Sequence, residues 1–366
     1  MSIQWRSLPD LPVGFKNGVG VTFGDTIYCG LGSLGQRWIA LDVNDALATK
    51  ELSPINGIGW QEKAPFPGCP RNDAVVISTS DGCYVFSGAG CEPEQIPQYP
   101  IVLTDGYFYN SKQDCWHKVC DDIPVGLLGG SGFQLTNGQL VFFGGYNKHK
   151  FDHLMHALNT EPLLSNSEMK SQCLVDFMSS AIEEYQWNQD IWSFTPETKQ
   201  WHRIAQNPFL ANCGAGAIVE GDKITLIEGE VKPGLRSRQV KQFSFDNSEL
   251  KNTLELTSIH QTDHDHEGLA GAFCSAYHGE WFVAGGAYFR GSQANYKKGQ
   301  WYSHQGLTKQ YDKKVWQFDG SKWAHIGDMT IGRAYGVCVS TTSGVIIVGG
   351  ERETGEALTE CQLLVC

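Results

Sequence analysis

The stretch Phe142-Phe143-Gly144-Gly145 sets the pattern of this chain, because an apolar strand that ends in glycine recurs along it. Five other segments follow this pattern closely or loosely: Tyr28-Cys29-Gly30, Phe86-Ser87-Gly88, Leu226-Ile227-Glu228-Gly229, Val283-Ala284-Gly285-Gly286 and Ile347-Val348-Gly349-Gly350. The closing glycines are separated by steps of 58, 57, 84, 57 and 64 residues. The chain therefore consists of six near-repeats, and one of them carries a carboxylate where others carry glycine.

A unit of roughly 50 residues whose strand ends in Gly-Gly has the period of a kelch-type propeller blade. Six such units fit into 366 residues. The 42 glycines, 11% aromatic residues and only 19% charged residues agree with many short strands joined by tight turns. The sequence therefore predicts an all-β fold, a six-bladed β-propeller that forms a single domain over residues 1–366.

A tryptophan-bearing strand follows most of the glycine pairs and predicts the outer part of each blade. Examples end at Trp116, Trp201 and Trp323. The sixth unit reaches the C-terminus without such a strand, whereas residues 4–9 at the other end have its form. We therefore expect the N-terminal strand to join the last unit and to close the ring, which removes an open sheet edge.

Two long insertions interrupt the repeat. The step of 84 residues predicts a partly helical insertion near residues 148–188, in which residues 179–185 have a helical composition. The second insertion, residues 288–309, is polar and aromatic. Long excursions from a rigid scaffold commonly carry binding function, so we expect both to lie over the binding face.

Charge and composition limit the partners and the compartment. The formal net charge of −12 argues against nucleic acid or an anionic membrane surface as a partner, since both need a basic face. Residues 1–5 lack the basic and apolar regions of a signal peptide, and no apolar run could span a bilayer. Several of the 12 cysteines, such as Cys29 and Cys83, lie inside apolar strand patterns. We expect a cytoplasmic protein; the alternative is a periplasmic one whose signal peptide was removed.

The copy that departs from the repeat carries the candidate chemistry. Glu228 and Glu230 stand at the glycine end of its strand, and Arg236 follows six residues after Glu230. If these strands end near one mouth of a central channel, Glu230 and Arg236 lie at that mouth. A carboxylate beside an arginine is held ionised and in place, as a general base must be. The alternatives are a loop salt bridge without chemical function, and Glu228 as the active carboxylate.

A cation precedes an apolar strand at three repeat-related positions, Lys16, Arg71 and Arg333. Equivalent positions lie at similar heights around a propeller axis, so we expect these side chains to converge on one side of the pore. A converging trio of cations suits a small carboxylate ligand, which arginine binds bidentately. Solvated loop charge is the alternative interpretation.

Other kinds of chemistry have little support in the sequence. Residues 260–266 contain three histidines and two aspartates, but their spacing matches no zinc pattern, so we expect no metal site. The chain has no glycine-rich phosphate loop, no G-x-S-x-G elbow and no Cys/His arrangement of known form. These gaps argue against nucleotide, hydrolase and thiol chemistry.

The chain resembles the kelch-type N-acetylneuraminate epimerases, the bacterial sialic acid mutarotases, from end to end. The string Gly229-Glu230-Val231-Lys232-Pro233-Gly234-Leu235-Arg236 is the most specific part of this likeness. Further matching segments are residues 12–18, 30–33, 70–71, 284–287, 291–296, 304–307 and 332–336.

This resemblance implies that the chain interconverts the α and β anomers of free N-acetylneuraminate by ring opening and closing, in support of sialic acid uptake and catabolism. It implies that Glu230 is the proton acceptor and Arg236 its companion in the site. Arg71, Arg333 or Lys16 would hold the sugar carboxylate. No metal or redox cofactor is implied. The oligomeric state and the group that protonates the ring oxygen remain open at this stage.

Two rival functions come from different classes. A sialidase would also use a six-bladed propeller and an arginine cluster, but the chain lacks the repeated S-x-D-x-G-x-x-W turns of sialidases. A kelch-type interaction scaffold would need neither Glu230 nor the cations, and would instead need a large exposed binding patch.

Overall fold

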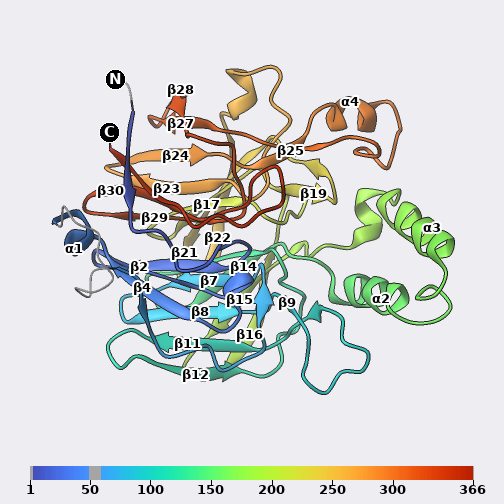
Figure 1. The fold of residues 1–366 in the computed structure, drawn as a ribbon, viewed down its shortest axis with the longest axis horizontal. Coiled ribbons are helices and arrows are strands. Elements are labelled where there is room, and N and C mark those ends of the chain that lie inside the picture. Colours follow the sequence, from blue (N-terminus) through green and yellow to red (C-terminus); the bar gives the residue numbers. More distant parts are fainter. Residues whose placement is uncertain (1–2, 49–58, 366) are drawn as a thin grey trace.

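The computed structural model describes residues 3–48 and 59–365, and over these residues the all-β prediction is confirmed (Figure 1). Most strands belong to six four-stranded antiparallel sheets. From the first to the sixth sheet, and from the inner to the outer strand, they are β2 (Val19–Phe23), β3 (Thr26–Gly30), β4 (Trp38–Asp42) and β5 (Gln61–Glu62); β7 (Val75–Ser78), β8 (Gly82–Phe86), β11 (Gly106–Asn110) and β12 (Cys115–Cys120); β13 (Ser131–Gln134), β14 (Leu140–Phe143), β15 (Asp190–Thr195) and β16 (Gln200–Gln206); β17 (Gly216–Glu220), β18 (Lys223–Ile227), β21 (Val240–Asp246) and β22 (Glu249–Leu256); β23 (Phe273–Tyr277), β24 (Glu280–Ala284), β27 (Lys314–Phe318) and β28 (Trp323–Asp328); β29 (Val337–Thr341), β30 (Gly344–Val348), β31 (Cys361–Val365) and β1 (Gln4–Leu8).

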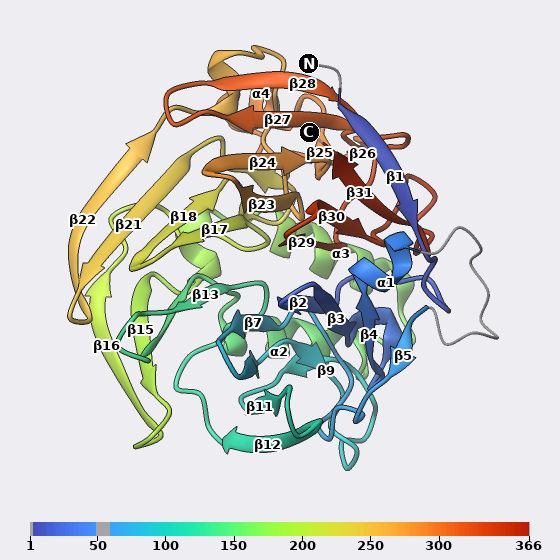
Figure 2. The ribbon, with the colours of Figure 1, turned by 90° about the vertical axis from the view of Figure 1, so that its left-hand side faces the viewer.

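The six sheets stand side by side around a common axis (Figure 2). Hydrophobic clusters fill the spaces between neighbouring sheets, including the space between the sixth and the first. In the cluster between the sixth and first sheets, Ile27 and Ile39 of the first sheet pack with Ile346 of the sixth. Each sheet is therefore covered by apolar side chains on both faces, and burial of this surface is the main stabilising term, at roughly 25 cal/mol per Å².

The N-terminal strand β1 is the outer strand of the sixth sheet. It pairs antiparallel with β31, from Gln4 opposite Val365 to Leu8 opposite Cys361. The Trp5 indole donates a hydrogen bond to the Asp328 carbonyl of the fifth sheet at 2.9 Å. Leu8 is 2% exposed and belongs to the cluster between the sixth and first sheets. The two ends of the chain thus build one sheet together.

The glycine pairs have a conformational cause. After the second strand of a sheet the chain passes through two residues with positive φ, for example 64° at Gly144 and 98° at Gly145, or 56° at Glu228 and 81° at Gly229. Other residues tolerate the first conformation, but the second lies outside the region that side chains adopt readily. At Gly229 a Cβ atom would also lie 2.8 Å from the Cys213 carbonyl oxygen. The repeat visible in the sequence is therefore the mark of this turn in five of the sheets, whereas in the first sheet Gly30 precedes the turn, and Leu31 and Gly32 have φ of 63° and 54°.

A closed cycle of six backbone hydrogen bonds surrounds the axis. Shortly before each inner strand, one residue donates its N–H to the carbonyl oxygen of the corresponding residue in the preceding sheet, at 2.8–2.9 Å. We call these six residues the axial ring: Asn17, Asp73, Gly129, Gly214, Gly271 and Tyr335. The Asn17 amide donates to Tyr335, so the cycle closes on itself. All six have φ between 52° and 70°.

Both insertions lie on one side of the sheets (Figure 1). The first contains α2 (Lys148–Leu158), α3 (Ser167–Met178) and a single 3-10 turn, Ile182–Tyr185. Its position agrees with the prediction, but residues 179–185 form only that turn, and the main helices precede it. Asn147 and Asn166 start these helices by accepting backbone hydrogen bonds as N-caps.

The second insertion and the remaining short elements complete the structure. The second insertion contains α4 (Ser292–Lys297) between β25 (Ala287–Phe289) and β26 (Lys309–Tyr311), which pair with each other. The other short elements are β6 (Arg71–Asn72), β9 (Ala89–Gly90), β10 (Ile101–Val102), β19 (Glu230–Lys232), β20 (Leu235–Arg236), α1 (Val43–Ala48) and the 3-10 turns Gly32–Leu34 and Ile259–Gln261.

Membrane and thiol features can be stated for the described residues. No helix in residues 3–48 or 59–365 has the length and apolarity needed to cross a bilayer. The cysteines of the same segments are free thiols. Burial raises the pKa of the Cys29 and Cys83 thiols, which lie in the second strands of the first and second sheets. These cysteines act as small apolar side chains.

Replacement of Leu8 tests how far the fold depends on β1. We expect Leu8→Ala to lower the free energy of unfolding by about 2–5 kcal/mol, because it leaves a cavity between the sixth and first sheets. Urea denaturation followed by tryptophan fluorescence measures this change. The control is Ser7→Ala on the exposed side of the same strand, which should change stability by less than about 0.5 kcal/mol. Equal, small effects would show that the packing of Leu8 contributes little to stability.

Candidate active site

A cavity of about 570 Å³ lies at one end of the axis. All six residues of the axial ring line it, together with Glu230 of β19. Phe151 and Met155 of α2 line it from the first insertion. Figure 2 shows α2 and α3 behind the centre of the sheets, which agrees with their place on one side in Figure 1. We call this space, between the axial ring and α2, the axial cavity.

The structure brings Glu230 and Arg236 together across the β19–β20 hairpin. Their Cα atoms are register partners, and Arg236 Nη1 lies 3.1 Å from Glu230 Oε1. The Gly234 amide also donates to Glu230 Oε1, at 3.3 Å. The Glu230 side chain is 20% exposed, into the axial cavity, whereas that of Arg236 is 1% exposed. A carboxylate with one cation, one amide donor and an open face is suited to accept a proton from a ligand.

Arg236 is itself fixed by the second insertion. Its Nε donates to the Ala287 carbonyl at 3.0 Å, and its guanidinium lies 4.9 Å from the centre of the Phe289 ring. The Tyr335 phenol of the axial ring hydrogen-bonds to Arg236 as well. The guanidinium therefore has little freedom to leave Glu230.

Lys232 ties the same hairpin to both insertions. Its buried ammonium donates to the Ser180 carbonyl of the first insertion and, at 2.8 Å, to the Trp301 carbonyl of the second. Burial lowers the pKa of Lys232 to about 8. Next to it, burial and the charges of Arg236 and Lys232 lower the pKa of His304 to about 4, so this imidazole is neutral at pH 7. A side chain at Gly234 would collide with His304, which lies 1.7 Å from the Cβ position.

Glu228 has a structural place that the sequence did not reveal. It is fully buried, and its two carboxylate oxygens accept hydrogen bonds from His266 Nε2 and from the Leu269 amide, both at 2.7 Å. It does not line the axial cavity, unlike Glu230. The geometry therefore favours Glu230 over Glu228 as the reactive carboxylate.

The three predicted cations have separate partners and do not line the axial cavity. The Arg71 side chain is 0% exposed and binds Asp105 bidentately, at 2.6 and 3.2 Å. The Arg333 side chain is also 0% exposed and donates to the Gly349 carbonyl and to Gln362, both at 3.3 Å. The expected convergence of three cations on one side of the pore is not what the structure contains.

A one-residue offset explains this difference. Arg71 and Arg333 stand two residues before their axial-ring members, Asp73 and Tyr335, whereas Lys16 stands one residue before Asn17. Successive side chains of extended backbone point to opposite sides. The position two before the ring is buried in other sheets too, as at Phe15. Arg71 and Arg333 therefore point into the protein.

Lys16 lies in a charged cluster at the edge of this region. Its ammonium donates to Glu351 Oε2 at 2.5 Å and to the Gly355 carbonyl at 2.7 Å, and its side chain is 26% exposed. Glu351 also accepts from Lys309 at 2.7 Å and from the Tyr311 hydroxyl. The cluster carries two cations and one carboxylate, so it has a net positive charge.

Further polar side chains that line the axial cavity were not predicted as site residues, among them Asn17, Asn72, Asp73, Tyr146 and Tyr335. The signal in the sequence was the residue type at the axial-ring positions. These positions have a positive φ, which asparagine, aspartate and glycine tolerate best. That signal becomes visible only when the six segments are aligned on the ring.

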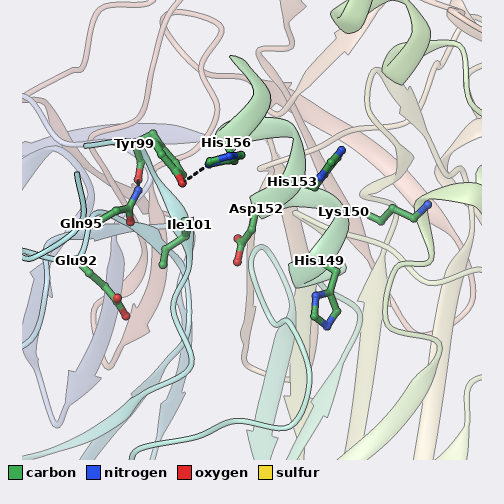
Figure 3. Close-up of a pocket in the computed structure, with 9 residues that line it drawn as sticks. All are labelled: Glu92, Gln95, Tyr99, Ile101, His149, Lys150, Asp152, His153 and His156. Atoms are coloured by element: carbon green, nitrogen blue, oxygen red, sulfur yellow. Dashed lines mark hydrogen bonds between the residues drawn. The ribbon is translucent and has the colours of Figure 1, made fainter. Parts of the chain in front are cut away.

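A second hollow of about 760 Å³ lies outside the axial cavity, between α2 and the loop that leads to β10 (Figure 3). His149, His153 and His156 of α2 line it, and His156 Nδ1 lies 2.9 Å from the Tyr99 hydroxyl.

No group of three or more side chains suited to bind a metal occurs in the described parts of the chain, and residues 260–266 are included in this statement.

The family is decided by a sequence comparison that covers almost the whole chain. A family model described as N-acetylneuraminate epimerase matches residues 8–366. The chain belongs to the N-acetylneuraminate epimerase family. The suspected resemblance is thereby confirmed, and the string that ends at Arg236 is the part of the N-acetylneuraminate epimerase pattern that forms the β19–β20 hairpin.

Relatives agree with membership of the N-acetylneuraminate epimerase family. A kelch domain-containing protein of Vibrio cholerae is 39% identical over 366 residues, which is 100% of this chain and 99% of the relative. The N-acetylneuraminate epimerases of Vibrio cholerae and Escherichia coli K12 are 38% and 34% identical, over 96% and 98% of this chain and 88% and 91% of their own lengths. A solved structure described as "Structure of YjhT" superposes with a TM-score of 0.86 at 32% identity, over 98% of this chain and 99% of that one.

The Glu228–His266 pair predicts a pH-dependent stability. Burial disfavours the charged imidazole, but the Glu228 charge and hydrogen bond outweigh it and raise the pKa of His266. A raised pKa in the folded state stabilises the fold fully below the ordinary histidine value of about 6.5, and this contribution is lost as the pH rises through the folded value. We expect His266→Gln to lose stability at acid pH and to approach the wild type at alkaline pH.

Urea unfolding of both proteins between about pH 5.5 and about pH 9 measures this difference. The control is His202→Gln, which removes an exposed imidazole from β16. A stability difference that does not depend on pH would show that His266 contributes only through packing.

Proposed function

We propose that this chain interconverts the α and β anomers of N-acetylneuraminate by acid–base ring opening and closing, with Glu230 as the proton acceptor. The supporting observation is the Glu230 carboxylate, which Arg236 and the Gly234 amide hold at the edge of the axial cavity. The names of the relatives supply the substrate. A cavity of about 570 Å³ is within the range of small-ligand pockets, roughly 300–1,000 Å³.

The proposed reaction needs no change of oxidation state. Glu230 takes the proton of the anomeric hydroxyl, a carbonyl forms at that carbon, and the bond to the ring oxygen breaks while that oxygen gains a proton. Rotation of the open chain and closure on the other face of the carbonyl give the second anomer. Arg236 holds the Glu230 carboxylate in position for this step.

The six sheets are proposed to be the blades of one closed six-bladed propeller, in a single domain, with β1 as the closing strand. Three observations support this: six four-stranded sheets, an apolar cluster between each neighbouring pair, and a cycle of hydrogen bonds that returns from Tyr335 to Asn17. This arrangement would give the axial cavity a rigid wall on every side.

Among the three predicted cations, Lys16 is the one we propose as a ligand of the sugar carboxylate. It is partly exposed, precedes Asn17 of the cavity wall, and belongs to a cluster with net positive charge. Arg71 and Arg333 are proposed to position the axial-ring residues two places after them, since their guanidinium groups are held by Asp105 and Gln362, respectively.

The compartment is also a proposal. Free, buried thiols such as Cys29 and Cys83 are suited to a reducing compartment, which favours the cytoplasm over the periplasm. Fractionation of the native host and detection of the protein in each fraction test this assignment.

Replacement of Glu230 tests the proposed function. We expect Glu230→Gln to lower the catalysed rate of anomer exchange by a factor of about 10²–10⁴, because the amide cannot accept the proton. Exchange NMR on N-acetylneuraminate, corrected for the rate without protein, measures this. Glu197→Gln, in an exposed turn, is the matched control. A wild-type protein that does not accelerate exchange would refute the function, and an active Glu230→Gln would move the base elsewhere.

Replacement of Lys16 tests the carboxylate ligand. We expect Lys16→Met to raise KM by about tenfold with little change in kcat, since it removes a binding charge rather than a reacting group. Lys223→Met, at an exposed position of β18, is the control. An unchanged KM in Lys16→Met, together with a raised KM in a folded Arg71→Lys or Arg333→Lys variant, would return the role to that arginine.

A further inference from the structure

Asp73 places a second carboxyl group in the axial cavity. It lies in the segment between β6 and β7, and its backbone belongs to the axial ring, where its amide donates to Asn17 and its carbonyl accepts from Gly129. Its side chain is exposed, and both Asp73 and Glu230 line the axial cavity. The ring fixes the backbone on both sides, so the position of this carboxyl is set by the fold rather than by a free loop.

The surroundings of the two carboxyl groups are opposite in sign. Glu230 lies against the Arg236 guanidinium and the Gly234 amide. The Asp73 side chain is exposed to the axial cavity, and the charged groups that act on it are carboxylates, Glu230 and Glu351. The depth of Asp73 within the molecule, followed by these two negative charges, raises the pKa of Asp73 to about 7. Two carboxyl groups with such contrasting surroundings in one site are a usual arrangement for an acid and a base.

The other titratable groups near Asp73 do not cancel this effect. Tyr146 and Cys213 interact with both Asp73 and Glu230, and burial raises the pKa of each, so both are neutral at pH 7. Lys16 and Lys309 pair with Glu351 at 2.5 and 2.7 Å and offset its charge, so Glu230 is the carboxylate that acts most on Asp73. Around neutral pH, Asp73 therefore carries a proton for a substantial part of the time.

We propose that Asp73 is the general acid of the reaction and gives its proton to the ring oxygen while Glu230 takes the proton of the anomeric hydroxyl. This proposal rests on the proposed function. When the ring opens, the bond from the anomeric carbon to the ring oxygen breaks, the ring oxygen keeps the electron pair and binds the Asp73 proton, and the hydroxyl oxygen forms the carbonyl. On closure the Asp73 carboxylate takes a proton back and Glu230 returns its own, so the enzyme regains its initial state.

The variant Asp73→Asn tests this role with little risk to the fold. The equivalent residue of the first sheet is Asn17, which has φ of 55° against 52° at Asp73, so asparagine already occupies this conformation in the same ring. We expect Asp73→Asn to lower kcat for anomer exchange by about 10²-fold or more, with KM changed less than about threefold. The matched control is Glu92→Gln, which also replaces a carboxylate by an amide, at an exposed position outside the axial cavity.

The dependence on pH separates proton donation from a structural role. In the wild type, kcat/KM corrected for the rate without protein should fall as the pH rises through about 7, because the acid form of Asp73 in the free enzyme is lost. Asp73→Asn should lack this alkaline fall, and Asp73→Glu should regain part of the rate. Near-UV circular dichroism reports whether each variant is folded. The pH profile of the wild type is a test that does not depend on the folding of any variant.

Three results would overturn the proposal. An Asp73→Asn protein with the wild-type kcat, while Glu230→Gln is inactive, would refute Asp73 as the acid. The proposed interconversion of anomers would remain supported. An alkaline fall that persists in Asp73→Asn would assign it to another group. If the wild type does not accelerate exchange at all, the proposed function fails, and the role of Asp73 fails with it.

Discussion

The axial ring is the constraint on which the rest of the structure depends. Six backbone hydrogen bonds pass from sheet to sheet and return to the first residue, so no sheet can shift along the axis without breaking two of them. Every ring residue must have a positive φ, which favours glycine, asparagine and aspartate and admits tyrosine only at a cost. Because each ring residue also lines the axial cavity, the same bonds that hold the sheets together define the shape of the candidate site.

The candidate functional residues lie where one sheet departs from the repeated sequence pattern of the others. In the fourth sheet the glycine pair is replaced by Glu228 and Gly229, and the chain then forms the hairpin with Glu230 and Arg236. Glu228 fixes the loop at His266, while Glu230 faces the cavity. Neighbouring carboxylates two residues apart thus have different tasks, and the difference follows from which of them finds buried partners.

The sequence was informative where the backbone itself restricts residue choice. The strand period could be predicted because a turn with two positive φ values leaves glycine pairs, and the Glu230–Arg236 pair because both residues stand in one short hairpin. The sequence could not predict which way the Arg71 and Arg333 side chains point. Their direction depends on whether a residue stands one or two positions before its axial-ring residue, and composition does not reveal that spacing. Asp73 was overlooked for the same reason. Its environment is made by Glu230 and Glu351, which are distant in the chain.

The shared sixth sheet has a consequence for how the protein is made. β1 leaves the ribosome long before its hydrogen-bonding partner β31, because more than 350 residues lie between them. Apolar interfaces between the first five sheets can form during synthesis, but the one between the sixth and first sheets must wait until the sixth sheet has been translated. Until then β1 is an unpaired strand, exposed to association with other nascent chains. Translation rate and chaperone capture of the N-terminal segment therefore bear directly on the yield of folded protein.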